Sequence, residues 1–171
     1  MNADNPYAAP EAELIPTWTE PREELAARSA RFAASLVDGI IGLLYGIPII
    51  YGLGIWTYMS AGQAPPIGLT VAAGVLGFLV FMLVHGYFLK ASGQTLGKKL
   101  AGIRIADLDG RLPDFGKVVL LRYLPISVVS QVPVVGTFLP MVDVLFIFRG
   151  DRRCVHDLLA GTKVVVTGVP R

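Results

Sequence analysis

The chain has 171 residues, of which 53% are hydrophobic and only 16% are charged. Soluble domains carry about 25% charged residues, so this composition excludes an ordinary soluble domain. The net charge of +2 comes from 15 basic and 13 acidic residues spread along the chain, which gives no indication of a nucleic-acid partner. The composition instead predicts a single domain that exposes little surface to water.

Residues 1–26 form a polar, acidic segment with prolines at Pro6, Pro10, Pro16 and Pro21. The segment lacks the apolar core of a secretory signal. Proline-rich polar sequence of this kind does not bury enough apolar surface to fold alone, so we expect a flexible cytoplasmic tail.

Two long apolar segments follow the tail. Residues 32–59 contain a single charged residue, Asp38, with Pro48 near the middle, where it can kink a helix. Residues 67–89 contain His85 and no charged residue. At ~1.5 Å per residue each segment is long enough for a ~30 Å hydrocarbon core. The short uncharged loop 60–66 makes the two predicted spans antiparallel neighbours.

A third apolar region, 118–148, is too long for one comfortable span and too short for two full ones. It is interrupted by Arg122, Pro125, Pro133, Pro140 and Asp143. We therefore expect a hairpin bent around residues 131–133, with segments at 118–130 and 133–148. The predicted fold is an all-α membrane protein, a helical bundle of about four membrane segments (two full spans plus a short or re-entrant hairpin).

A small cytoplasmic β element is predicted beside the bundle. Residues 102–107 alternate like a strand and lead into Asp109-Gly110, a favoured hairpin turn. Residues 162–167 form a second strand pattern near the carboxyl end. We expect these two regions to pair at the membrane surface.

Basic residues indicate the orientation of the spans. The loop 60–66 carries no charge, whereas basic residues precede the first span, follow the second and follow the third apolar region: Arg22, Arg28, Arg31, Lys90, Lys98, Lys99, Arg104, Arg111, Lys117, Arg149, Arg152, Arg153 and Lys163. Since cytoplasmic loops are enriched in lysine and arginine, both termini are predicted to be cytoplasmic. A single crossing by the third region would break this rule, which also favours the hairpin.

Several ionisable residues fall inside the apolar regions, where a charge is costly and either pairs or serves a function. Arg122 and Asp143 would lie at equal depth in the predicted hairpin, so both a structural ion pair and a functional role fit them. Asp38 has no clear cation in its own hairpin, which favours a functional role. His85 is predicted to be an interfacial residue rather than a proton relay.

Two segments partly match motifs of soluble enzymes, but neither match is complete. Residues 93–99 resemble a phosphate loop, but the glycines are too close and no serine or threonine follows the lysine. We interpret them as a helix cap and a basic patch at the lipid headgroups. Cys154 is the only cysteine and lacks further ligands at metal-binding spacing, and His156-Asp157 alone indicates no hydrolase. We therefore expect no metal, no cofactor and no enzyme activity.

Three ordered motifs resemble the RDD family of bacterial integral membrane proteins, which is named for an arginine and two aspartates. The motifs lie at 27–38, 93–105 and 154–162, and the resemblance extends over about 27–168. Arg31 and Asp38 match the family's arginine and first aspartate. The closing motif favours Asp157 over Asp143 as the second aspartate. The resemblance implies residence in a bacterial inner membrane and suggests transport, including cation–proton exchange.

Two hypotheses follow. In the first, the protein is a small exchanger in which the carboxylate of Asp38 alternately binds a cation (Na⁺, K⁺ or Li⁺) and a proton. Arg31 competes for this carboxylate or tunes the pKa of Asp38. So few helices leave no room for inverted repeats in one chain, so a homo-oligomer would be needed. In the second, the protein is a non-transporting accessory or protein-interaction module, and its buried charges are structural.

Overall fold

The computed structural model describes residues 24–132 and 135–168. Most of the predicted tail therefore lies outside the described residues. The described chain is mostly helical with one small sheet, and its elements in order are α1 (Arg28–Gly52), α2 (Ile55–Ser60), α3 (Ile67–Ser92), α4 (Leu96–Leu100), β1 (Ile103–Asp107), α5 (Phe115–Lys117), η1 (Val118–Tyr123), α6 (Leu124–Val129), α7 (Val135–Leu145), η2 (Phe146–Phe148), α8 (Val155–Leu159) and β2 (Thr162–Val166).

Helices α1 and α3 are long and apolar enough to cross a membrane, as predicted. Almost none of their apolar residues are buried by the rest of the protein. Leu44 and Leu83, for example, are 72% and 82% exposed. Apolar side chains exposed along the whole length of a helix require an apolar surrounding, so these helices suit a bilayer and not the core of a soluble protein.

The first apolar segment is not one continuous helix. Helix α1 starts at Arg28, ends at Gly52, and is followed after a short break by α2. Gly54 precedes α2 with a φ of 69°, a left-handed conformation that glycine adopts at no steric cost. The predicted single span over 32–59 is therefore divided into a long helix and a short one.

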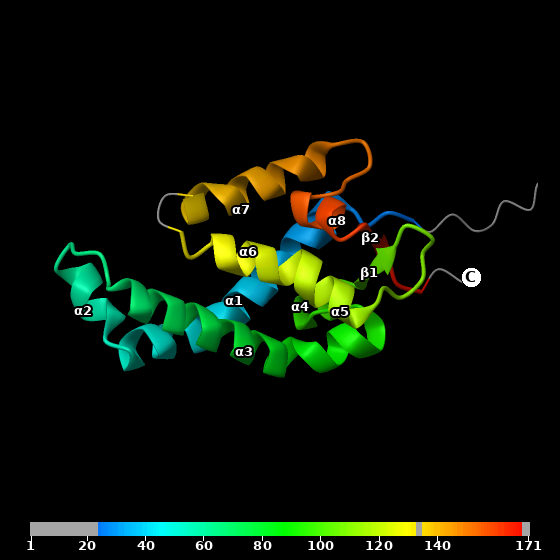
Figure 1. Ribbon diagram of the computed structural model, residues 1–171. Helices are drawn as coiled ribbons and strands as arrows, with labels where there is room; N and C mark the ends of the chain where they lie inside the picture. The colour runs from blue at the N-terminus through cyan, green and yellow to red at the C-terminus, as the bar shows by residue number, and fades with distance from the viewer. Residues whose placement is uncertain (1–23, 133–134, 169–171) are drawn as a thin grey trace, which may run out of the picture.

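The third apolar region folds into two helical arms. The first arm runs without interruption through α5, η1 and α6, and α7 returns alongside it (Figure 1). The predicted turn around residues 131–133 is described only up to Val132. Element η1 is a π-helix, whose backbone hydrogen bonds join residues five apart instead of four, so the side chains that follow are rotated about the helix axis.

The two predicted strands pair as an antiparallel sheet, with Ile105 opposite Val164. Ile103, Ile105, Val164 and Val165 are buried and form much of the core. The chain before α1 also joins the sheet, because the amide of Ala26 donates to the carbonyl of Val164 at 3.0 Å and Leu25 bridges to Val165. The prediction of a free tail up to residue 26 is wrong for residues 24–26.

The elements gather at two ends of the molecule. Figure 1 shows β1, β2, α4, α5 and α8 at one end, together with the start of α1 and the end of α3. Helix α2 lies at the opposite end. Nearly all the charged residues discussed below belong to the first end.

Candidate functional site

Asp157 is the centre of a buried ion-pair network. Its carboxylate accepts a hydrogen bond from the Arg31 guanidinium at 2.5 Å, and a second guanidinium, that of Arg122, also donates to it. The same carboxylate accepts from the backbone amide of Cys154 at 3.0 Å and so caps the start of α8. One carboxylate thus joins α1, η1 and α8.

The network excludes solvent. Asp157 is fully buried, while Arg122 and Arg31 are 3% and 8% exposed. Burial alone would raise the pKa of Asp157, but the positive charges of Arg122 and Arg31 outweigh it and hold this pKa well below its usual range. Asp157 is therefore ionised at neutral pH and fully engaged by its partners, as expected of a structural ion pair.

The predicted pairing of Arg122 with Asp143 is wrong. Arg122 turns instead toward Asp157 and also donates to the hydroxyl of Thr162 at 2.7 Å. Asp143 pairs with His156, accepting from its backbone amide at 3.1 Å and contacting its Nδ1 at 2.6 Å. Equal depth in a hairpin does not fix the direction of a side chain, and the π-helix η1 rotates Arg122 in a way that sequence periodicity does not predict.

Asp38 lies within α1 and is bound by the loop and helix that follow α3. The hydroxyl of Thr95 donates to its Oδ2 at 2.5 Å and the amide of Gly97 donates to its Oδ1 at 2.8 Å. The ammonium of Lys98 lies 3.8 Å from Oδ2. We expected a role for Arg31 beside Asp38. Its partners come instead from α4, and Arg31 binds Asp157.

The prediction that His85 is an interfacial, snorkelling residue is also wrong. Its side chain is fully buried by protein. Its Nδ1 accepts a hydrogen bond from the amide of Leu96 at 3.2 Å, and its ring lies 4.8 Å from that of Phe81. His85 therefore fixes the start of α4 beside α3, which places Thr95 and Gly97 against Asp38.

An open cavity of ≈ 780 Å³ connects these groups. Its walls are mainly apolar, with side chains such as Phe32, Leu36 and Ile126. The polar side chains that line the cavity come from the surroundings of both Asp157 and Asp38, and they include Arg31, Asp38, Lys98, Arg122, Asp143 and His156. A largely apolar cavity with a few converging charged groups is the usual form of a binding site.

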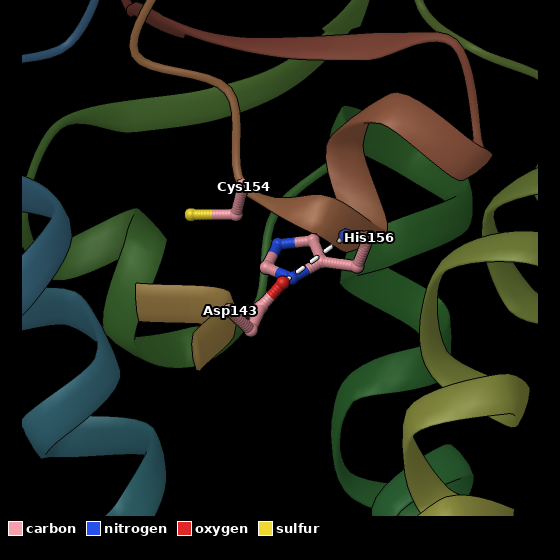
Figure 2. A group of neighbouring side chains, drawn as sticks. All are labelled: Asp143, Cys154 and His156. Atoms are coloured by element: carbon pink, nitrogen blue, oxygen red, sulfur yellow. Dashed lines mark hydrogen bonds and ion pairs between the residues drawn. The ribbon is translucent and has the colours of Figure 1, made fainter. Parts of the chain in front are cut away.

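A second cluster lies at the side of this cavity. Asp143 at the end of α7 and Cys154 and His156 at the start of α8 bring one potential metal-ligand atom each to within 4.8 Å of the others. In Figure 2 the carboxylate of Asp143 points at the ring of His156, and the thiol of Cys154 lies beside the pair. Burial raises the pKa of the Cys154 thiol to about 11, so the free thiol is protonated at neutral pH.

The sequence indicated six of these residues through their position in apolar regions or in the opening and closing motifs: Arg31, Asp38, His85, Arg122, Asp143 and Asp157. It missed the partners of Asp38. Thr95, Gly97 and Lys98 were interpreted only as a cap and a basic patch. The cap is confirmed, since Thr95 begins α4 and accepts from the amide of Lys98. The one available signal was the run of polar and small residues directly after a span, Gly93 to Gly97, which suits close contact with another helix.

These observations define a helical protein with two candidate membrane-crossing helices and a buried charge site at one end. The chain belongs to the RDD family, whose model matches residues 25–161. It is also 29% identical over 142 residues to a Haemophilus influenzae protein described as uncharacterized, an alignment that covers 82% of this chain and 77% of the relative. No solved structure matches the chain.

Proposed function

We propose that this protein is a small cation–proton exchanger of a bacterial inner membrane. In this proposal the carboxylate of Asp38 binds a monovalent cation and a proton alternately. The observation that carries the proposal is that Asp38 lies in a candidate membrane-crossing helix and lines the open cavity. A carboxylate inside a membrane helix that faces a cavity is a typical site for ion or proton binding.

The surroundings of Asp38 differ from those of Asp157 in a way that supports this role. Asp157 is fully buried and binds two arginines, so no ion can reach it without breaking the network. The side chain of Asp38 is 18% exposed, and its cationic neighbour is the Lys98 ammonium at 3.8 Å. Lysine is a flexible point charge, so Lys98 can move away when a cation binds.

Exchange also needs a path across the bilayer. We propose four membrane segments: α1 and α3 as full spans, and the two arms of the third region as a shorter or re-entrant hairpin. The short α6 and α7 do not by themselves cover a ~30 Å hydrocarbon core. A homo-oligomer would complete the path, because one chain with so few helices has no second repeat to alternate against the first.

The test is proton flux in sealed proteoliposomes that carry a pH gradient, with Na⁺, K⁺ or Li⁺ added in turn. We expect wild-type protein to dissipate the gradient only with a particular cation. Asp38→Asn should abolish this flux, because the amide binds neither a cation nor an exchangeable proton at neutral pH. The matched control is Asp109→Asn, which removes an exposed carboxylate in the loop after β1 and should retain full flux.

Circular dichroism and size-exclusion chromatography establish that each variant is folded. Absence of flux from folded, correctly inserted wild-type protein would overturn the exchanger. It would leave the membrane accessory or protein-interaction module as the hypothesis to pursue.

A further inference from the structure

The cluster of Asp143, Cys154 and His156 has no part in the proposed exchange. Two of its members are buried and the third is half-buried, and all three line the cavity. We propose that these three side chains form a binding site for a divalent transition-metal ion of the zinc type. This inference is independent of the proposed function, since it concerns other residues and a different class of ion.

The donor set supports this class of metal. A thiolate, an imidazole nitrogen and a carboxylate oxygen are the three ligand types that Zn²⁺ accepts in proteins. A soft sulfur ligand disfavours Mg²⁺ and Ca²⁺, which prefer oxygen. Three protein ligands leave a fourth position of a tetrahedron free, and the cavity that all three residues line would give a fourth ligand access to the ion.

The separation of the ligand atoms is close to what a metal needs. Ligand atoms around tetrahedral zinc lie about 3.3–3.8 Å apart, which follows from its bond lengths of roughly 2.0–2.3 Å. The three atoms here lie within 4.8 Å of one another, and the Asp143 oxygen and the His156 Nδ1, now hydrogen-bonded at 2.6 Å, would separate by under about 1 Å to hold an ion between them. In Figure 2 the Cys154 thiol points away from this pair, so its side chain would also rotate toward the pair when an ion binds.

The position of His156 suits a metal ligand in a second respect. When Nδ1 binds the metal, the proton of the neutral ring resides on Nε2. Nε2 lies 3.9 Å from a carboxylate oxygen of Asp157. Metal-bound histidines usually direct their other ring nitrogen to a carboxylate or carbonyl, which fixes the tautomer and raises ligand basicity. Asp157 would supply that contact here.

The local charge also permits a metal. Arg31 and Arg122 are balanced by Asp143 and Asp157, so the cluster is neutral while the thiol is protonated. Binding of the ion releases the thiol proton, and the thiolate then offsets part of the added charge. The Arg31 guanidinium lies 3.5 Å from the Cys154 sulfur, where it also favours the thiolate.

Cobalt(II) provides a direct test, because it replaces zinc in such sites and gives a thiolate-to-metal charge-transfer absorption band. Cys154 is the only cysteine in the sequence, so this band reports on a single residue. We expect the band when Co²⁺ is added to tag-free, chelator-treated wild-type protein in detergent. Zn²⁺ should displace the Co²⁺ and abolish the band, whereas Mg²⁺ should not. Absence of the band from folded wild-type protein would overturn the site.

Variants test the other two ligands. Asp143→Asn with His156→Gln should weaken Zn²⁺ binding by about 100-fold or more, measured by competition with a chromophoric chelator. Cys154→Ser should abolish the Co²⁺ band and still fold, since serine is a preferred residue at a helix N-cap. Asp151→Asn changes an exposed carboxylate close by and should bind Zn²⁺ as wild type does.

Unchanged Zn²⁺ affinity in the double variant would also overturn the site. If that variant fails to fold, the wild-type Co²⁺ spectrum and Cys154→Ser still decide the question. These are binding measurements on solubilised protein, so a failure of the exchanger in proteoliposomes does not affect them.

Discussion

Two aspartates, Asp38 and Asp157, are held in this protein by different kinds of partner. Asp157 binds two guanidinium groups and an amide with no access to solvent. Asp38 binds a hydroxyl and an amide, with a lysine ammonium farther away. Two fixed arginines neutralise the carboxylate of Asp157, whereas the cation beside Asp38 is a lysine, whose flexible side chain can move away. At the scale of single residues, Asp157 therefore has a structural role, whereas the proposed exchange is assigned to Asp38.

Removal of the charge of Asp157 should destabilise the fold strongly. Asp157→Asn leaves the Arg31 and Arg122 guanidinium groups buried without a counter-charge, and loss of one partner of a buried ion pair costs about 3–5 kcal/mol. We expect a large drop in melting temperature in detergent by circular dichroism. Asp151→Asn, on the exposed Arg149 pair, should change stability by less than about 0.5 kcal/mol. Equal melting temperatures for the two variants would contradict the structural role.

The pH dependence of stability should report the same network. The positive charges of Arg122 and Arg31 lower the pKa of Asp157 in the folded protein despite its burial. The contribution of Asp157 is then fully present above its unfolded pKa of about 3.9, and it is lost as the pH falls below that value. Melting curves from pH 7 to pH 3, with chelator present, should decline more steeply for wild type than for Asp157→Asn. Parallel declines would contradict this assignment.

At the scale of elements, the short α4 determines the position of the Asp38 site. It packs on α1 so closely that a Cβ atom at Gly97 would overlap the carbonyl oxygen of Ala34 and the carboxylate of Asp38. Thr95 caps α4 and also binds Asp38. The same few residues therefore start a helix, pack it and hold the carboxylate.

Gly97→Ala should separate α4 from α1. Because the neighbouring atom is backbone and cannot move aside, we expect a loss of stability of about 1–3 kcal/mol, typical of an overpacked core, together with reduced cation-dependent flux. Gly46→Ala is the matched control on α1, where a Cβ meets nothing within 4 Å. It should melt at or slightly above the wild-type temperature, since alanine favours helix. A Gly97→Ala protein as stable and active as this control would show that the close contact is dispensable.

At the scale of the whole molecule, charged and apolar surfaces are segregated. The sheet, α4, α5 and α8 form one end, and the long apolar faces of α1 and α3 extend from it toward α2 (Figure 1). This segregation, with the basic residues concentrated at the first end, supports the proposal that the end bearing the sheet faces the cytoplasm.

Cysteine accessibility tests that orientation. In a Cys154→Ser background, Gln63→Cys in the loop before α3 should react with a membrane-impermeant maleimide in intact cells. Asp109→Cys, in the loop after β1, should react only after the cells are permeabilised. The reverse pattern would place the sheet and both described ends of the chain outside the cytoplasm.

The sequence by itself determined the class of protein, the two long apolar helices, the paired strands and the family. These properties depend on composition, on the length of apolar segments and on the local alternation of apolar and polar residues, and all three are visible in the sequence itself. It also determined that Asp38, Arg122 and Asp143 need partners, because a charge in an apolar segment is costly wherever the segment lies.

Only the tertiary structure decided which partners they have. Arg31 and Arg122 both bind Asp157, Asp143 binds His156, and Asp38 binds the start of α4. Such pairings depend on the rotation of each helix about its axis, which the π-helix at 118–123 changes, and on close contacts such as that at Gly97. The grouping of Asp143 with Cys154 and His156 arises for the same reason, since α7 and α8 meet only in the folded protein.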